Sequence, residues 1–372
     1  MKLKAIIEQV SGVAFILAAL CLPLNSFGQN SIDGPYVLKE KGTTFSYRVG
    51  ADSTLMKTKF DPSRPLKVEV PNADRDQFQV KLKGDIKNEK DEYPMPGKLL
   101  VISDIEGNFN GFYSFLVNNG VMDKNYNWTY KDGHVVLVGD FVDRGEYVTQ
   151  VLWLIYMLEE KAKQHGGKVH YILGNHEIKN LQGDVRYVLQ SYVKTAQEIS
   201  GLKECDKAYR YLFSTNSELG RWLRSKNIIE RIGPYVFVHG GISHKLLRYK
   251  PTIGSLNEAV RAHIDAVPDS GSFAAFVMSK EGPFWYRGMA RVDKRYWKMS
   301  AKHFNEVVAY FKAERIVIGH TLGQDIRTGY KKRLIKIDIK HGQEKNTGKT
   351  KGLIVEKGVE YKVDDMGKRM PL

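Results

Sequence analysis

The sequence predicts an α/β fold, and two observations carry that prediction. Short apolar runs rich in β-branched residues recur after residue 98, which is typical of strands buried on both faces. Segments between them, such as 148–158 and 304–311, place apolar residues at the spacing of one helix face. Strands that alternate with helices indicate a sheet core covered by helices. The runs are residues 99–102, 135–138, 169–173, 235–238 and 316–318.

The composition fits a soluble globular protein. The chain has 372 residues, of which 42% are hydrophobic and 27% charged. Its net charge of +15 favours anionic partners such as phosphorylated compounds, nucleic acid or a membrane surface. A solvated, lysine-rich surface explains the same charge, so the charge alone does not select a partner.

The N-terminus resembles a secretory signal. Lys2 and Lys4 precede the apolar run 13–22, and 26–28 place small residues where a signal peptidase cuts, which predicts cleavage after Gly28. We therefore expect an exported protein, periplasmic or secreted, with an uncleaved anchor as the alternative. Leu20 is bulkier than lipid attachment at Cys21 favours. No later segment is apolar and long enough to be a transmembrane helix.

The mature chain divides into two predicted parts. Residues 29–97 are polar, and the period-two runs 45–49, 66–70 and 78–82 predict β-hairpins. Residues 85–98 are charged and contain Pro94 and Pro96, which predicts a linker. Residues 98–372 form the second part, and we expect it to close with antiparallel strands at 334–339, 352–356 and 360–363.

Polar residues next to glycine follow each of the five apolar runs. The carboxyl ends of strands in an α/β sheet bind ligands, so these loops can converge on one place. Mixed oxygen and imidazole donors suit divalent metals. The sequence therefore predicts a metal site there. The residues are Asp104-Ile105-Glu106-Gly107, Gly139-Asp140, Asp143-Arg144-Gly145, Gly174-Asn175-His176-Glu177, His239-Gly240-Gly241 and Gly319-His320.

Taken together, these blocks resemble the calcineurin-like metallophosphoesterases. The likeness is greatest to their phosphoprotein phosphatase branch, including the bacterial Shewanella-like phosphatases and the diadenosine polyphosphate hydrolases. It implies a four-layer α/β/β/α sandwich, here with a small β-rich N-terminal extension. It also implies two divalent metal ions. The implied ligands are Asp104 and Glu106 for the first metal, Asp140 for both, and Asn175, His239 and His320 for the second.

The resemblance also assigns the chemistry. A hydroxide that bridges the two metals would attack the phosphorus atom. His176 would protonate the leaving oxygen, with Asp143 orienting its ring. Arg144 and, by a looser match, Arg287 would bind the phosphate.

Each of these residues has a structural alternative. Asp104 would instead cap the helix that begins near Phe109, and the pair Asp143 and Arg144 would be a structural ion pair. Asp140 and Asn175 would be turn residues. The alternatives for the others are satisfied core histidines at His239 and His320, a surface cation at Arg287, a supporting role for Glu177, and core packing for Phe284, Trp285 and Tyr286.

Glu106 departs from the family pattern, which has histidine at this position of Asp-x-His-Gly. A carboxylate is a harder donor than imidazole, so we expect a preference for manganese or magnesium over iron or zinc, with manganese the first choice. The alternative is that Glu106 does not bind metal and the first site is weak.

The expected function is hydrolysis of phosphomonoesters, with phosphoproteins as one substrate class. One alternative is cleavage of phosphoanhydrides or phosphodiesters such as dinucleotide polyphosphates. Another is a non-catalytic binder of anionic ligands. The sequence gives no evidence of specific nucleic-acid binding.

Overall fold

The computed structural model describes residues 31–291 and 296–372. The predicted signal segment, residues 1–28, lies outside the described residues. Among the helices that the structure describes, none combines the length and the apolar character needed to cross a membrane.

Two six-stranded sheets form the centre of the molecule. Both are mixed, and the predicted buried strands are divided between them. The strand order in one is β17 (Arg369–Pro371), β16 (Val359–Asp364), β15 (Lys351–Glu356), β7 (Lys98–Ile102), β8 (His134–Val138) and β9 (Lys168–Ile172). The order in the other is β13 (Arg327–Gly329), β14 (Leu334–Lys336), β12 (Arg315–Ile318), β11 (Tyr235–Val238), β10 (Ile229–Ile232) and β6 (Glu92–Tyr93).

The two sheets pack face to face because their strands are apolar on both sides. Along β7, Leu99 and Val101 belong to the core between the sheets, together with Phe237 and Val317 of the other sheet. The alternate residues of β7 belong to a separate core that includes the helices. Successive strand residues point to opposite faces, so each strand supplies both cores.

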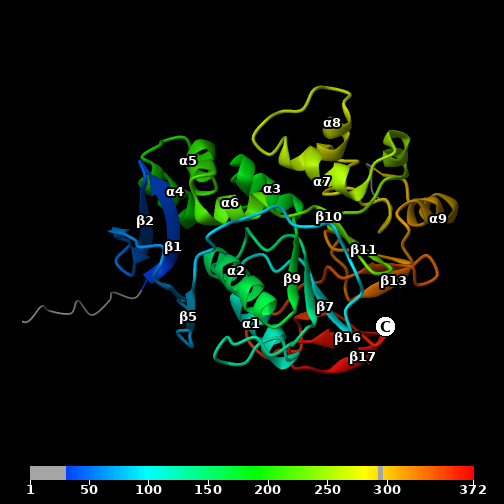
Figure 1. Cartoon of the computed structure of the whole chain (residues 1–372), viewed down its shortest axis with the longest axis horizontal. Helices are drawn as coiled ribbons and strands as arrows, with labels where there is room; N and C mark the ends of the chain where they lie inside the picture. Colours follow the sequence, from blue (N-terminus) through cyan, green and yellow to red (C-terminus); the bar gives the residue numbers. More distant parts are fainter. Residues whose placement is uncertain (1–30, 292–295) are drawn as a thin grey trace, which may run out of the picture.

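Helices cover the outer faces of the two sheets (Figure 1). Helix α2 packs on β9, and α7 packs on β10. The resulting order of layers is helix, sheet, sheet, helix, which confirms the predicted α/β/β/α sandwich. The helices are α1 (Phe109–Asn118), α2 (Val148–Gln164), α3 (Asn175–Gln182), α4 (Gln190–Ser200), α5 (Cys205–Leu212), α6 (Glu218–Arg224), η1 (His244–Tyr249), α7 (Ile253–Arg261), α8 (Phe273–Met278) and α9 (Ala301–Tyr310).

The N-terminal region is β-rich, as predicted. Strands β1 (Ser31–Glu40), β2 (Thr43–Gly50) and β3 (Leu55–Lys59) form an antiparallel sheet, and β4 (Leu66–Glu69) pairs with β5 (Gln77–Val80). Strand β1 lies against α2 and α6 (Figure 1). The indole Nε1 of Trp153 on α2 donates a 2.8 Å hydrogen bond to the carbonyl of Pro35. This sheet is therefore attached to the helical layer.

Two segments differ from their predictions. Residues 85–98, read as a linker, contribute β6, which pairs parallel with β10. Residues 334–339 were expected to form an antiparallel strand, but β14 pairs parallel with β12 and antiparallel only with β13. The physical reason is common to both: residue periodicity indicates burial, and it does not specify the neighbouring strand.

A buried ionic network also holds residues 85–98 in place. The ammonium of Lys226, whose side chain is 2% exposed, lies 3.0 Å from Glu89 and 2.8 Å from Glu159. Lys168 lies 2.7 Å from the other oxygen of Glu89. Two lysines on separate elements thus fix one carboxylate of the predicted linker.

Candidate metal centre

The five polar loops converge at one end of the sandwich. Those after β7, β8 and β9 come from one sheet, and those after β11 and β12 come from the other. They surround a cavity of about 590 Å³. Of the ten predicted site residues, the lining includes Asp104, Glu106, Asp140, Arg144, Asn175, His176, Arg287 and His320. The other two, Asp143 and His239, lie directly behind it, against His176 and Asp140.

Several site residues adopt the left-handed backbone region. The φ angles of Asp104, Asp140 and His320 are 54°, 58° and 61°. Such angles are unfavourable for residues other than glycine and persist only where the surroundings fix them. Here the amide of Asp104 donates to the carbonyl of Gly139 at 2.9 Å, which joins two of the loops. The strain turns these side chains from the strand direction into the cavity.

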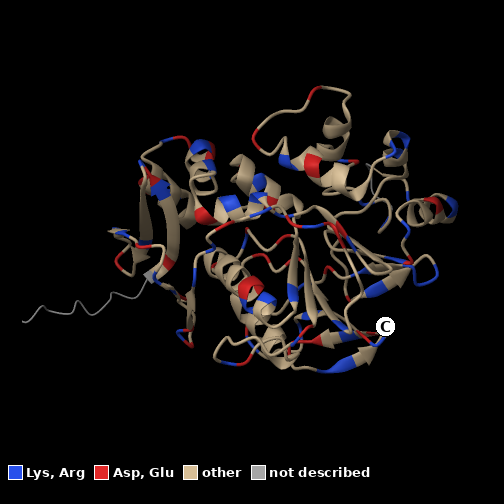
Figure 2. Cartoon of the chain, viewed as in Figure 1, with Lys and Arg blue, Asp and Glu red and all other residues tan. Residues whose placement is uncertain are grey.

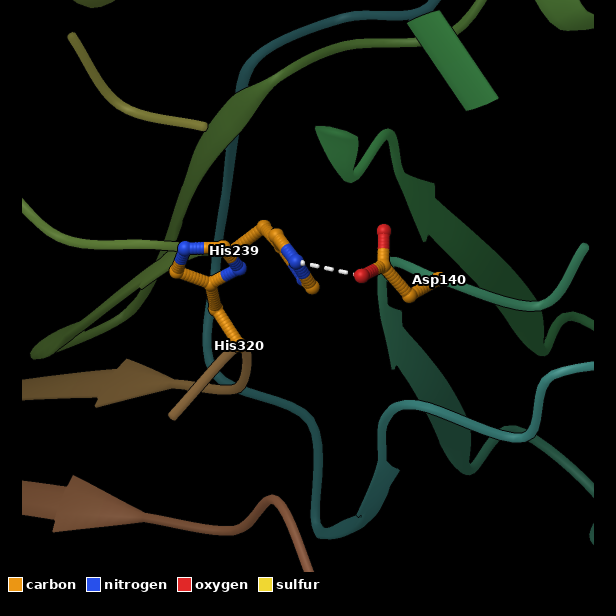
Figure 3. Close-up of side chains that lie close together, drawn as sticks. All are labelled: Asp140, His239 and His320. Carbon is orange, nitrogen blue, oxygen red and sulfur yellow. Dashed lines mark ion pairs between the residues drawn. The ribbon is translucent and has the colours of Figure 1, made fainter. Parts of the chain in front are cut away.

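Asp140, His239 and His320 form the centre of the cluster. Figure 3 shows the ring of His239 directed at the Asp140 carboxylate, with the ring of His320 beside it. His239 Nε2 lies 3.0 Å from Oδ2 of Asp140, and one donor atom from each of the three residues lies within 4.8 Å of the others. This spacing is suited to a single cation coordinated by mixed nitrogen and oxygen ligands.

The charges of the trio require a positive partner, either a proton or a metal ion, beside Asp140. Burial would lower the pKa of His239, but the Asp140 carboxylate outweighs it and raises the pKa to about 10. Nδ1 of His239 lies 2.8 Å from the carbonyl of Val138, so Nε2 faces Asp140. Burial and the nearby His239 lower the pKa of His320, whose buried Nε2 has no hydrogen-bond partner among the described residues. A divalent cation would satisfy both nitrogens.

A second acidic group lies beside this trio. Burial and the charge of Asp338 raise the pKa of Asp104 well above its ordinary value. Burial and the charge of Asp140 raise the pKa of Asp338 in turn. Three carboxylates in one buried cluster repel one another unless a cation or a proton intervenes. The donor set therefore fits divalent metal ions, and Asp104 and Asp140 are the candidate carboxylate ligands in it.

Asp104 does not cap a helix. The N-cap of α1 is Asn108, whose side chain accepts from the amide of Gly111 at 3.0 Å. Both carboxylate oxygens of Asp104 instead accept from the amide of His320, at 3.2 and 3.3 Å. This excludes the capping alternative.

Glu106 is paired with a cation of the protein itself. Its carboxylate is in direct contact with the guanidinium of Arg144, and the two side chains are 25% and 49% exposed. Arg144 also lies over the ring of Tyr187, with its central carbon 5.4 Å from the ring centroid. The carboxylate at the family's histidine position is thus directed toward the cavity mouth and held by Arg144.

His176 is fixed by a chain of buried hydrogen bonds. Its Nδ1 lies 2.5 Å from Oδ2 of Asp143. The other oxygen of Asp143 accepts from Asn180 at 2.7 Å, and Asn180 accepts from the hydroxyl of Tyr209 at 2.9 Å. With Nδ1 so engaged, the other ring nitrogen, Nε2, lies 3.8 Å from Oδ2 of Asp140 at the cavity.

Glu177 supports the loops, in agreement with the supporting role considered for it. The side chain is fully buried and receives four hydrogen bonds. Its donors are the amides of Asp140 at 2.9 Å, Phe141 at 2.7 Å and Gly174 at 2.7 Å, and the hydroxyl of Tyr171 at 3.0 Å. One carboxylate therefore joins the loops after β8 and β9.

The aromatic set 284–286 divides between core and cavity. Phe284 and Tyr286 are buried, as expected. Trp285 instead lines the cavity, with its ring edge-on to His320 at 5.8 Å between centroids. Arg287 donates to the carbonyl of His320 at 2.7 Å, so its guanidinium is anchored at the cavity and is not a surface cation.

A separate histidine group lies at the surface. His244, His303 and Glu306 place their donor atoms within 4.8 Å of one another. The two rings stack at 4.0 Å with an interplanar angle of 10°. The in-plane lone pairs of parallel rings do not converge on one point, so this arrangement fits a metal less well than the buried trio.

Sequence reasoning missed three residues of the site. Asp338 follows β14, but the sequence pattern extends the predicted strand to residue 339, so the strand-end rule did not select Asp338. Lys179 and Asn180 lie on α3, where i+3 and i+4 spacing from His176 places them on the same helix face. Lys179 lines the cavity, and Asn180 holds Asp143.

A model of the calcineurin-like phosphoesterase family matches residues 97–324. The chain belongs to the calcineurin-like phosphoesterases. It is therefore a hydrolase of a family that uses divalent metals, and the matched region contains every predicted site residue.

Two relatives are named Shewanella-like protein phosphatases, which is the branch that the sequence motifs resemble. The chain is 27% identical over 245 residues to Shewanella-like protein phosphatase 1 of Plasmodium berghei, covering 65% of this chain and 66% of that one. It is 25% identical over 286 residues to Shewanella-like protein phosphatase 2 of Arabidopsis thaliana, covering 66% and 72%. This chain thus spans about two thirds of the Plasmodium protein.

A solved structure extends the likeness beyond the family model. The crystal structure of a cold-active protein-tyrosine phosphatase of a psychrophilic Shewanella species has a TM-score of 0.77 and 28% sequence identity. The match covers 91% of this chain and 98% of that chain. It therefore includes most of the N-terminal β-rich region, which the family model leaves out.

Proposed function

We propose that this protein is a metal-dependent phosphatase that hydrolyses phosphomonoesters, with phosphoproteins as its substrate class. The observation that carries the proposal is the buried His176–Asp143 pair beside the metal centre. A protein that only binds anions has no need of an imidazole held in one tautomer next to a cluster of metal ligands.

The charge of the cavity suits a phosphorylated substrate. Lysine and arginine alternate with aspartate and glutamate along the described parts of the chain (Figure 2). Five of these cations line the cavity. They are Arg144, Lys179, Arg287, Arg291 and Lys340.

Each group has a defined role in this proposal. Two divalent cations, held by Asp104, Glu106, Asp140, Asn175, His239 and His320, would neutralise the phosphoryl oxygens and lower the pKa of a water molecule. Arg144 and Arg287 bind the oxygens of the phosphoryl group through their planar guanidinium forks. His176 Nε2 donates a proton to the leaving oxygen, while Asp143 holds the ring and stabilises its charged form.

The choice of phosphoproteins rests on the relatives. Two of them are named protein phosphatases, and the solved structure is named a protein-tyrosine phosphatase. The cavity is open and bordered by Tyr187 and Leu322, which are 41% and 61% exposed. An exposed apolar border suits a side chain presented by another protein better than a small, fully enclosed metabolite.

The test uses purified mature protein stripped of metal and supplied with Mn²⁺, Mg²⁺, Zn²⁺ or Fe²⁺. Phosphate release is measured from peptides that contain phosphotyrosine, phosphoserine or phosphothreonine, and from a dinucleotide polyphosphate. We expect metal-dependent release from at least one phosphopeptide and a large loss in His176→Ala. Phosphate release that depends neither on added metal nor on His176 contradicts the proposal. Hydrolysis of the dinucleotide polyphosphate alone contradicts it as well.

A further inference from the structure

We propose that Lys179, with the rings of Tyr187 and Trp285, forms a subsite for a second anionic group of the substrate, next to the leaving oxygen. This inference rests on the proposed phosphatase function and adds a substrate class to it. The subsite would take a phosphoester whose leaving group carries a carboxylate or another phosphate, such as a phosphorylated residue beside an acidic residue.

The helix places Lys179 beside the groups expected to act in catalysis. Asn175 and His176 lie in the first turn of α3, and Lys179 follows them by four and three residues. Residues at these spacings share one face of a helix. Lys179 lines the same cavity as both, one turn further from the metal centre.

The ammonium group of Lys179 is held between two rings. Its Nζ lies 3.9 Å from the centroid of Tyr187 and 4.7 Å from that of Trp285. The residue is only 6% exposed, yet among the described residues no ion pair or side-chain hydrogen bond engages its ammonium. Burial lowers the pKa of Lys179, because the charged form has lost part of its hydration. An anion in the cavity would replace that lost hydration.

The position of the rings indicates which part of the substrate reaches Lys179. Tyr187 packs edge-on against His176, with ring centroids 4.9 Å apart, and its backbone carbonyl accepts from the amide of Arg144 at 3.0 Å. His176 is the expected proton donor to the leaving oxygen. Lys179 lies next to His176, so its ammonium faces the leaving group attached to that oxygen. Arg144 and Arg287 already serve the transferred phosphoryl group. Lys179 is only 6% exposed, so little water surrounds it, and a charge contact there is stronger than in open solvent.

The experiment compares two phosphopeptides that differ at one position next to the phosphorylated residue, Glu in one and Gln in the other. The enzyme is the metal-loaded mature protein. Lys179→Met removes the charge at similar length, Lys179→Arg keeps it, and Lys163→Met removes the charge of an exposed lysine on α2. We expect the wild type to favour the Glu peptide by about tenfold in kcat/KM.

In Lys179→Met this preference should disappear, mainly through a higher KM for the Glu peptide, while Lys179→Arg and Lys163→Met keep it. A preference that survives in Lys179→Met, or an equal loss of kcat on both peptides, overturns the subsite. An active wild type that does not distinguish the peptides also overturns it while leaving the phosphatase function intact. A wild type that hydrolyses no phosphomonoester refutes the proposed function itself.

Discussion

His176 and Asp143 form a buried pair in which Nδ1 lies 2.5 Å from Oδ2. Neither side chain is more than 5% exposed. The carboxylate fixes which ring nitrogen carries the proton, so the other nitrogen faces the cavity. An imidazole positioned in this way can donate a proton to the leaving oxygen. Its contribution to bond cleavage is larger when the leaving oxygen is more basic.

Asp143→Asn should therefore lower kcat by roughly 10²-fold on an alkyl phosphate. The loss should be smaller on p-nitrophenyl phosphate, whose leaving group departs readily without a proton. Steady-state kinetics on both substrates, with metal content measured in parallel, check this. Equal losses on both substrates, at unchanged metal content, would argue against a proton-donating role for His176.

Glu106→His should change which metal the protein selects. Imidazole replaces a hard carboxylate, so the affinity for Zn²⁺ and Fe²⁺ should rise relative to Mn²⁺. Competitive loading followed by elemental analysis measures the ratio, and Glu198→His on the exposed side of α4 is the matched control. If the ratio does not move, Glu106 is not a ligand and acts through Arg144 alone.

Asp338→Asn should weaken metal binding by about tenfold, because one negative charge is lost from a buried cluster that already contains Asp104 and Asp140. Isothermal titration of the metal-free protein with Mn²⁺ gives the affinity. Asp269→Asn removes an exposed charge far from the cavity lining and serves as the control. An Mn²⁺ affinity that is unchanged or higher would show that Asp338 is protonated and carries no charge that attracts the metal.

Gly174→Ala should disrupt the metal centre, although Gly174 is not itself one of the proposed ligands. A Cβ atom at this position would lie 2.2 Å from Oδ1 of Asp140. Overpacking of this kind costs roughly 1–3 kcal/mol and would displace the carboxylate. Gly84→Ala, where the added atom meets nothing within 4 Å, is the control. Full metal occupancy and wild-type stability in Gly174→Ala would contradict the observed spacing.

Glu89 should make stability depend on pH. Burial would raise the pKa of Glu89, but the charges of Lys226 and Lys168 outweigh it and lower the pKa to about 2. A lowered carboxylate pKa stabilises the fold above the unfolded value of about 4.5, and this contribution is lost as the pH falls toward 2. The difference between these two pKa values corresponds to a contribution of roughly 3 kcal/mol to the free energy of unfolding.

Urea unfolding of the metal-free wild type and Glu89→Gln at several pH values tests this. The two should differ most at pH 5–6 and converge toward pH 2. A constant difference across that range would mean that packing at residue 89, and not its charge, carries the effect.

Much of the fold could be predicted from local pattern. The β-branched runs correspond to β7, β8, β9, β11 and β12, and no strand end differs from its prediction by more than one residue. The rule that polar residues at strand ends bind ligands predicted that Asp104, Asp140 and His320 meet at one cavity. Glycine directly precedes Asp140 and His320 and allows a sharp turn there, whereas Asp104 lies between Ser103 and Ile105.

The remainder depends on contacts between distant segments. No local signal distinguishes one sheet from two, so the division of the five strands was not predicted. Asp338 was hidden because Ile335, Ile337 and Ile339 continue the strand pattern on both sides of it. Lys179 was missed because Trp285, one of the two rings beside its ammonium, lies far along the chain, and only folding brings the two together.

The four hydrogen bonds of Glu177 come entirely from the protein. The loops after β8 and β9 are thus tied together before any ion arrives, and an ion that binds would have little reorganisation to drive. Donors fixed in this way favour ions whose size and hardness match them, so donor type sets the preference among divalent ions. Exchange of one metal for another would proceed without unfolding.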